Sequence, residues 1–196
     1  MKRIILITGG QRSGKSSEAE RMALSLSDCP VYVATAHIWD EEFRERVRKH
    51  QERRGPQWTN IEEERELSRH DVTGRVVLID CCTLWATNYF SPTPASPEGE
   101  GPITDGSGEE SITDGSGENL PDVDSALKAL QAEFDRFTQQ DATFIFVTNE
   151  IGMGGVSANA VQRRFTDLLG WFNQYVAQQA DEVFLMVSGI RMKIKG

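Results

Sequence analysis

A glycine-rich run near the start of the chain limits the possible folds more than any other feature. The run T-G-G-Q-R-S-G-K-S-S, residues 8–17, contains the spacing G-x-x-x-x-G-K-S. An apolar run precedes it at residues 4–7 and a helical pattern follows it, which is the strand–loop–helix context of a P-loop. Glycines let the backbone close around a phosphate chain, and the loop N–H groups together with the helix N-terminus attract the anion. The run therefore predicts a site for a nucleoside triphosphate.

Two side chains of this motif have separate roles in such a loop. Lys15 is expected to reach the β and γ phosphates, and the Ser16 hydroxyl is expected to hold Mg²⁺. A second metal ligand is expected from the apolar run 76–79, which ends in Asp80, because a strand that ends in a carboxylate beside a P-loop is the Walker B pattern. The predicted nucleotide-binding residues of this region are Gly9, Gly10, Gln11, Arg12, Ser13, Gly14, Lys15, Ser16 and Asp80.

Composition and charge exclude several classes of function. The 196 residues carry a formal net charge of −9, which argues against a nucleic-acid partner bound by a basic surface. No stretch approaches the roughly 18 apolar residues of a membrane span, and residues 1–3 lead directly into a short strand without a signal peptide. We therefore expect a cytoplasmic protein without a membrane span. Cys29, Cys81 and Cys82 suggest no disulfide framework and are expected to be small buried residues.

Apolar runs that alternate with helical patterns predict the architecture. Helical stripes are typical of residues 17–26, with Leu26 on the buried face, of residues 125–137, and of a long segment from about residue 157. The alternation indicates one α/β domain over 1–196, with a mainly parallel sheet covered on both faces. Besides the strand before the P-loop, strands are expected at 31–35, 76–80, 143–148 and, as the last strand of the chain, 181–187.

Residues 91–124 have a different composition from the rest of the chain. They contain five prolines and many Gly and Glu residues, and the segment 103–109 is repeated at 112–118. Such a segment buries too little apolar surface to offset the entropy cost of ordering the chain. We expect a flexible acidic insertion in the domain. A calcium-binding repeat is disfavoured, because two copies without the rest of that motif cannot stack into a core.

His50 has two interpretations. Asp40 is a suitable N-cap for a helix on which Phe43, Val47 and His50 lie on one face. The histidine is then either a core or helix-capping residue, or a catalytic group that faces the nucleotide. Spacing alone does not distinguish these interpretations.

Six segments give the chain a family resemblance. They are I-T-G-G-Q-R-S-G-K-S, Y-V-A-T-A, D-E-E-F-R-E-R-V-R-K-H, L-I-D-C-C-T-L-W-A-T-N, V-T-N-E-I-G-M-G and A-D-E-V-F-L-M-V-S-G-I-R-M-K-I-K. Together they resemble the bifunctional adenosylcobinamide kinase/adenosylcobinamide-phosphate guanylyltransferases of cobalamin biosynthesis. The resemblance covers nearly the whole chain apart from residues 91–124. Its most specific parts are the N-E-I-G-M-G block and the H-x-x-x-R segment that begins at His50.

The resemblance implies a RecA-like fold, a homotrimer and two reactions. In the first, ATP or GTP gives its γ-phosphoryl group to the aminopropanol hydroxyl of adenosylcobinamide, with Mg²⁺ on Ser16 and Asp80. In the second, His50 attacks the α-phosphorus of GTP, and the GMP-histidine intermediate passes its GMP to adenosylcobinamide phosphate. The resemblance also extends the GTP site to Ala34, Thr35, Ala36, Gln51, Glu52, Arg53, Arg54 and Glu62.

Two functions of other classes stay open at this point. A plain P-loop small-molecule kinase would form no covalent GMP adduct. A non-catalytic nucleotide-gated module, whose acidic loop binds a partner, would turn over neither nucleotide nor corrinoid. The intact mass of the protein after incubation with GTP and Mg²⁺ separates the three functions.

Overall fold

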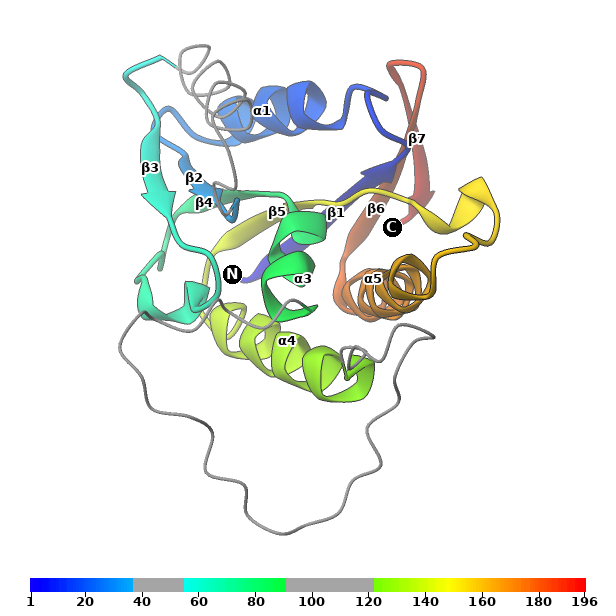
Figure 1. The fold of residues 1–196 in the computed structure, drawn as a ribbon. Helices are drawn as coiled ribbons and strands as arrows, with labels where there is room; N and C mark the ends of the chain where they lie inside the picture. The colour runs from blue at the N-terminus through cyan, green and yellow to red at the C-terminus, as the bar shows by residue number, and fades with distance from the viewer. Residues whose placement is uncertain (37–54, 91–121) are drawn as a thin grey trace, which may run out of the picture.

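The structure, a computed structural model, describes residues 1–36, 55–90 and 122–196. Its central element is a seven-stranded sheet with the strand order β3-β2-β4-β5-β1-β6-β7 (Figure 1). Neighbouring strands are parallel except β6 and β7, which are antiparallel. The strands are β1 (Arg3–Gly9), β2 (Val31–Ala34), β3 (Thr59–Glu62), β4 (Val76–Asp80), β5 (Thr143–Val147), β6 (Glu182–Val187) and β7 (Ile190–Lys195).

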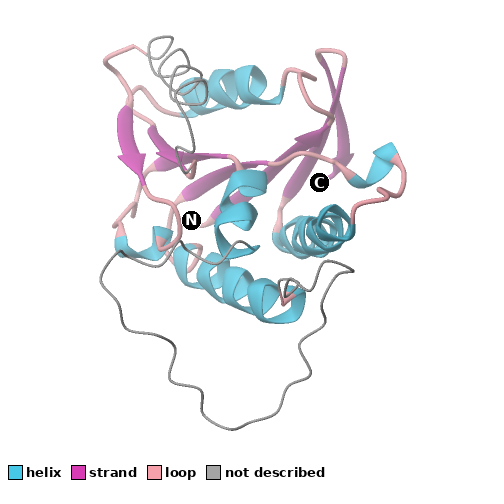
Figure 2. Cartoon of the chain, viewed as in Figure 1, coloured by secondary structure: helices cyan, strands magenta, loops and turns pink. Residues whose placement is uncertain are grey.

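Helices cover both faces of this sheet (Figure 2). One face carries α1 (Lys15–Leu26), and the other carries α3 (Cys82–Phe90), α4 (Val123–Phe137) and α5 (Ala160–Gln179) (Figure 1). Two short 3₁₀ helices, η1 (Leu67–Arg69) and η2 (Gly152–Gly154), belong to loops. None of the helices in the described ranges is long and apolar enough to span a membrane. The prediction of an α/β fold with a mainly parallel sheet covered on both faces is confirmed.

The inner strands carry apolar side chains on both faces, because helices cover both faces of the sheet. In β1, Ile4 and Leu6 pack toward α3, α4 and α5, whereas Ile5 and Ile7 pack toward α1. Each of these four side chains is at most 1% exposed. This is why a continuous apolar run, rather than an alternating one, predicted the strand correctly. The largest fully buried side chains on the α3–α5 face are Trp85, Phe134, Phe137, Phe144, Phe146 and Phe172.

A further strand follows the one that was expected to be the last. The antiparallel β7 follows β6, so the prediction that residues 181–187 form the last strand was wrong. Ser188 and Gly189 lie between the two strands with φ of 51° and 83°, and a two-residue turn with positive φ at both positions reverses the chain into a hairpin. All six residues of β7 are exposed. The strand therefore lacks the buried apolar pattern on which strand prediction depends.

Two further elements were not predicted. The edge strand β3 reads T-N-I-E, and three of its four residues are exposed, so it shows no apolar run. The helix α3 reads C-T-L-W-A-T-N-Y-F, in which β-branched and aromatic residues weaken the helical signal. Packing of Trp85 and Phe90, both buried, against neighbouring helices stabilises α3 instead.

Three smaller expectations need correction. The insertion was expected to reach Asp124, but α4 already begins at Val123, because the side chain of Asp122 caps it by accepting from the Asp124 N–H. Leu26 is 43% exposed, since α1 ends there and Ser27 is already extended. Cys29 is exposed in the loop that follows α1. The rest of the expected insertion, residues 91–121, lies outside the described residues.

Candidate active site

The glycine-rich loop lies at the carboxyl end of β1, between that strand and α1. Gly9 ends the strand with φ of 149°, and Gly14 precedes α1 with φ of 96°, conformations that favour glycine. No side chain of the described residues caps the first turn of α1, so its first N–H groups stay available to an anion. Strand, loop and helix have the arrangement that the motif predicted.

The β6–β7 hairpin supports this loop. The N–H of Gly189, in the hairpin turn, donates to the Ser13 carbonyl oxygen at 3.0 Å. Arg191 of β7 forms an ion pair with Glu18 of α1 at 2.8 Å. The hairpin thus contacts both the loop and the helix that follows it.

Gly9→Ala is expected to lower the free energy of unfolding by about 1–3 kcal/mol through overpacking. The added Cβ would lie 2.4 Å from the Met186 carbonyl oxygen of β6, and the φ of Gly9 is strained for alanine. Gly10→Ala is the matched control, because a Cβ there meets nothing within 4 Å. Urea unfolding of both variants measures the difference. Equal stabilities would show that the loop moves away from β6 without cost.

Lys15 begins α1 and is largely buried, with 7% of its surface exposed. Its Nζ donates to the Gly10 carbonyl oxygen at 2.6 Å, so the ammonium group lies against the backbone of the loop. Desolvation lowers the pKa of Lys15, whereas Cys81 and Asp80 act in the opposite direction. Desolvation also raises the pKa of the Cys81 thiol to about 11. The Cys81 thiol is therefore uncharged at neutral pH.

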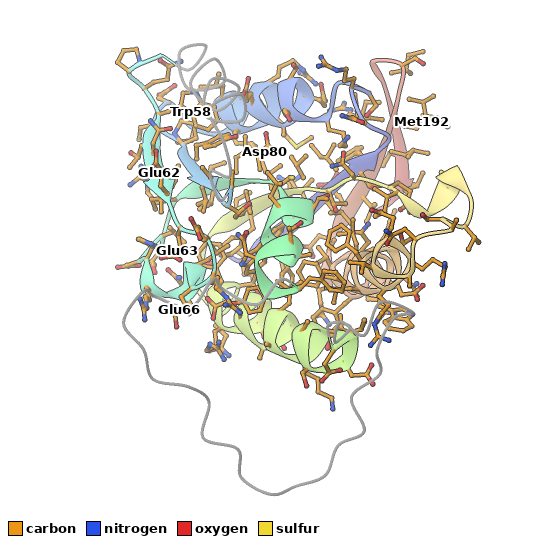
Figure 3. The ribbon with its side chains drawn as sticks, in the orientation of Figure 1. Trp58, Glu62, Glu63, Glu66, Asp80 and Met192 are labelled. Carbon is orange, nitrogen blue, oxygen red and sulfur yellow. The ribbon has the colours of Figure 1, made fainter. Side chains whose placement is uncertain are left out.

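Asp80 ends β4 on the face of the sheet that α1 covers, two residues after Leu78 (Figure 3). The Tyr32 hydroxyl donates to Asp80 Oδ2 at 3.2 Å. Sequence reasoning missed Tyr32 as a site residue, because it read β2 only as a buried strand. Strand register in the structure identifies it: Ala34 pairs with Asp80, and Tyr32 lies two residues before Ala34 on the same face.

The residues at the end of β2, which the resemblance assigns to the GTP site, lie beside Asp80. Ala34 pairs directly with Asp80 across β2 and β4. The Thr35 hydroxyl donates to the Cys81 carbonyl oxygen at 2.9 Å, and Ala36 follows at the same edge of the sheet. This row of strand ends is the edge at which ligands bind in open α/β sheets.

Glu62 lies at the same edge but away from the glycine-rich loop. It ends β3, the outermost strand, and pairs with Ala34. Four strand spacings separate β3 from β1 in the sheet, a distance of roughly 19 Å. Glu62 also lines a cavity of about 810 Å³ together with Glu63 and Glu66, which follow β3 (Figure 3), and with residues of α3 and α4. The structure therefore does not bring Glu62 and the loop into contact.

The remaining predicted site residues fall into two groups. Within the loop, Gly10, Gln11 and Arg12 are exposed, Ser13 is buried, and Ser16 is partly buried in the first turn of α1. Five others lie outside the described residues, and with them the helix expected from Asp40. These five are His50, Gln51, Glu52, Arg53 and Arg54.

The N-E-I-G-M-G block begins at Asn149, and Thr148 separates it from β5, which lies between β4 and β1. The N–H of Glu150 donates to the Gly9 carbonyl oxygen at 3.0 Å, which places the block beside the glycine-rich loop. The Thr148 hydroxyl donates to Asn173 Oδ1 at 2.7 Å, and Asn173 Nδ2 donates to the Asn149 carbonyl oxygen at 3.1 Å. These hydrogen bonds to α5 hold the chain where it leaves the sheet.

Among solved structures, the flagellar accessory protein FlaH from Methanocaldococcus jannaschii shares 14% sequence identity, with a TM-score of 0.45, over 98% of this chain and 78% of that chain. The P4 protein from bacteriophage phi6 in complex with ADP shares 13% identity, with a TM-score of 0.45, over 97% of this chain and 52% of that chain.

Similarity in sequence extends over nearly the whole chain. The bifunctional adenosylcobalamin biosynthesis protein CobP of Pseudomonas aeruginosa is 34% identical over 196 residues, 97% of this chain and 96% of that protein. The bifunctional adenosylcobalamin biosynthesis protein CobU of Escherichia coli is 34% identical over 98% of this chain and 99% of its own length. Residues 5–194 match the family described as "Cobinamide kinase / cobinamide phosphate guanyltransferase". The chain belongs to the cobinamide kinase / cobinamide phosphate guanyltransferase family.

Proposed function

We propose that this protein phosphorylates adenosylcobinamide with ATP or GTP and then transfers GMP from GTP to adenosylcobinamide phosphate, giving adenosylcobinamide-GDP and pyrophosphate. The observation that carries the proposal is the family match over residues 5–194 in a chain whose glycine-rich loop has P-loop geometry. The two reactions are those that the family description names. The protein is accordingly a transferase.

The loop from Gly9 to Ser16 binds the triphosphate in this proposal. The uncapped first turn of α1 and the Lys15 ammonium group supply positive charge to the phosphates. The Ser13 hydroxyl supports this role, because it is buried and has no hydrogen-bond partner among the described residues. A buried polar group that the protein leaves unpaired is expected to meet a ligand or water.

Mg²⁺ fits the donors at the end of β4. A strand-end carboxylate, Asp80, and a hydroxyl in the first turn of α1, Ser16, are oxygen ligands of the kind that Mg²⁺ prefers. The described ranges contain no group of three or more His, Cys, Asp or Glu residues that would hold a metal alone, and Mg²⁺ in such sites takes one or two protein ligands and completes its shell with phosphates and water. When bound, the ion would neutralise charge on the β and γ phosphates.

In the kinase reaction, the hydroxyl oxygen of the aminopropanol arm forms a bond to the γ-phosphorus. The bond between that phosphorus and the β–γ bridging oxygen breaks, ADP or GDP leaves, and the hydroxyl proton passes to solvent or to a neighbouring base. Lys15 stabilises the charge that develops on the phosphoryl oxygens, which is the main contribution a protein makes to phosphoryl transfer.

In the guanylyl-transfer reaction, the neutral imidazole of His50 attacks the α-phosphorus of GTP and pyrophosphate leaves. The phosphate of adenosylcobinamide phosphate then displaces the imidazole, so that GMP passes to the corrinoid. Histidine suits this role because its neutral form is nucleophilic near pH 7. The segments 34–36 and 51–54, together with Glu62, line the GTP in this proposal. The family resemblance also supports a homotrimer in the cytoplasm.

The test is the intact mass of the protein after incubation with GTP and Mg²⁺. A mass increase of one GMP, removed on addition of adenosylcobinamide phosphate, is the expected result. Corrinoid phosphorylation without any adduct would instead identify a plain kinase. Failure to turn over either nucleotide or corrinoid would identify a binding module.

A further inference from the structure

Tyr32 connects the middle of β2 to the carboxylate at the end of β4. Strand register places Tyr32 opposite Leu78 and Ala34 opposite Asp80, so Tyr32 and Asp80 are diagonal neighbours on one face of the sheet. The Tyr32 hydroxyl spans this diagonal and donates to Asp80 Oδ2 at 3.2 Å. The bond involves one of the two carboxylate oxygens.

The tyrosine ring is held where it cannot easily turn away. Tyr32 is 5% exposed and Trp58 is 7% exposed. The two rings meet edge to face, with centroids 6.1 Å apart and an interplanar angle of 83°, a favourable geometry for an aromatic pair. Trp58 directly precedes β3, and β3 pairs with β2. Residues on or next to β2, β3 and β4 therefore determine the position of the Tyr32 hydroxyl.

We propose that Tyr32 is a positioning residue: it orients the Asp80 carboxylate toward the metal ion that accompanies the triphosphate. This inference rests on the proposed function, in which Asp80 is a magnesium ligand. In this proposal Tyr32 acts through Asp80 and does not itself bind the nucleotide or the metal. Carboxylate ligands of metals are held by hydrogen bonds from groups behind them, and loss of such a group costs about 10- to 100-fold in metal affinity or activity.

A tyrosine–aspartate hydrogen bond elsewhere in the chain offers a matched control. The Tyr175 hydroxyl, on α5, donates to both oxygens of Asp135, on α4, at 2.7 and 2.8 Å. This pair joins two helices on the face of the sheet opposite α1. Tyr175→Phe removes the same chemical interaction as Tyr32→Phe, but at a place that the nucleotide proposal does not involve.

The experiment measures binding of a slowly hydrolysed GTP analogue by calorimetry, with Mg²⁺ and with EDTA. In the wild-type protein, Mg²⁺ is expected to tighten binding. In Tyr32→Phe, binding in EDTA is expected to stay unchanged, whereas the tightening by Mg²⁺ falls about tenfold or more. Tyr175→Phe should retain the full magnesium effect. Thermal unfolding of both variants without nucleotide records any loss of stability separately.

A double variant shows whether Tyr32 acts through Asp80. Asp80→Asn alone should weaken the magnesium effect, and adding Tyr32→Phe should weaken it no further, because the two residues act as one unit. An additive loss, or an unchanged magnesium effect in Tyr32→Phe, would overturn the inference. If the wild-type protein binds the analogue without any magnesium effect, Asp80 is not a metal ligand and the inference falls as well. Absence of binding to the wild-type protein would instead contradict the proposed function.

Discussion

His50→Asn is expected to abolish the GMP adduct while the protein still folds, binds GTP and phosphorylates adenosylcobinamide. Asparagine keeps the polarity and approximate size of the side chain, but it lacks the nucleophilic ring nitrogen. Intact mass after incubation with GTP and Mg²⁺ measures the adduct, and product analysis measures corrinoid phosphorylation. The loss of adenosylcobinamide-GDP should be complete, because no other group in the proposal carries GMP.

The alternative interpretation of His50, as a core residue, makes a different prediction. In that case His50→Asn lowers stability by about 1–2 kcal/mol and depresses both reactions together. His70→Asn is a suitable control, since His70 is a partly buried histidine 3.6 Å from Glu63 and has no role in the proposal. A normal adduct yield in His50→Asn, or an adduct that maps to Lys49, would contradict the assignment of the nucleophile.

The chemistry of the adduct gives a second check on the histidine. A phosphoramidate is stable in base and labile in acid, so the adduct should survive alkaline treatment and be lost in acid. Its formation should also decline below about pH 6.5, the usual pKa of histidine. Adduct formation falls rather than rises at lower pH, because protonation of the imidazole removes the lone pair that attacks phosphorus.

Lys15→Ala is expected to slow both reactions on the order of 10²-fold or more, because each needs a triphosphate neutralised at the same loop. Initial rates of corrinoid phosphorylation and of adduct formation, each at saturating GTP, measure the effect. Lys128→Ala, an exposed lysine on α4, is the control for loss of a positive charge. Undiminished adduct formation in Lys15→Ala would mean that the GTP used for guanylyl transfer binds elsewhere.

Lys15 is also largely buried, so the variant needs a control for folding. Removal of its aliphatic stem leaves a small gap at the start of α1, which is expected to lower stability modestly. Thermal unfolding separates this effect from a loss of catalysis. A folded variant that has lost both activities supports a shared loop.

Sequence patterns predicted the elements whose determinants lie close together in the chain. The strand, glycine-rich loop and helix at residues 3–26 were recognised because each element follows the previous one directly and only one backbone arrangement suits the motif. The strands β4 and β5 were recognised because strands buried on both faces read as continuous apolar runs. Asp80 was placed correctly for the same reason, as the polar residue that ends such a run.

Elements without a buried apolar pattern could not be predicted in this way. β3 and β7 are edge strands, so one side of each has no partner strand in the described sheet, and their side chains are largely exposed. Their existence depends on backbone pairing with β2 and β6, which no local pattern records. The helix α3 is likewise stabilised by the packing of Trp85 and Phe90 against other helices rather than by helix propensity.

The sequence alone determined the P-loop, the α/β fold class and the family, because the spacing of glycine, lysine and apolar residues along the chain is a local property. Only the tertiary structure decided which distant residues complete the site. Tyr32 and Asp80 are 48 positions apart, and they meet because β2 and β4 are neighbours in register. Glu62 lies at the same sheet edge as Gly9, but four strand spacings separate their strands, β3 and β1. Strand order sets both relations, and that order results from how the whole chain buries its apolar surface.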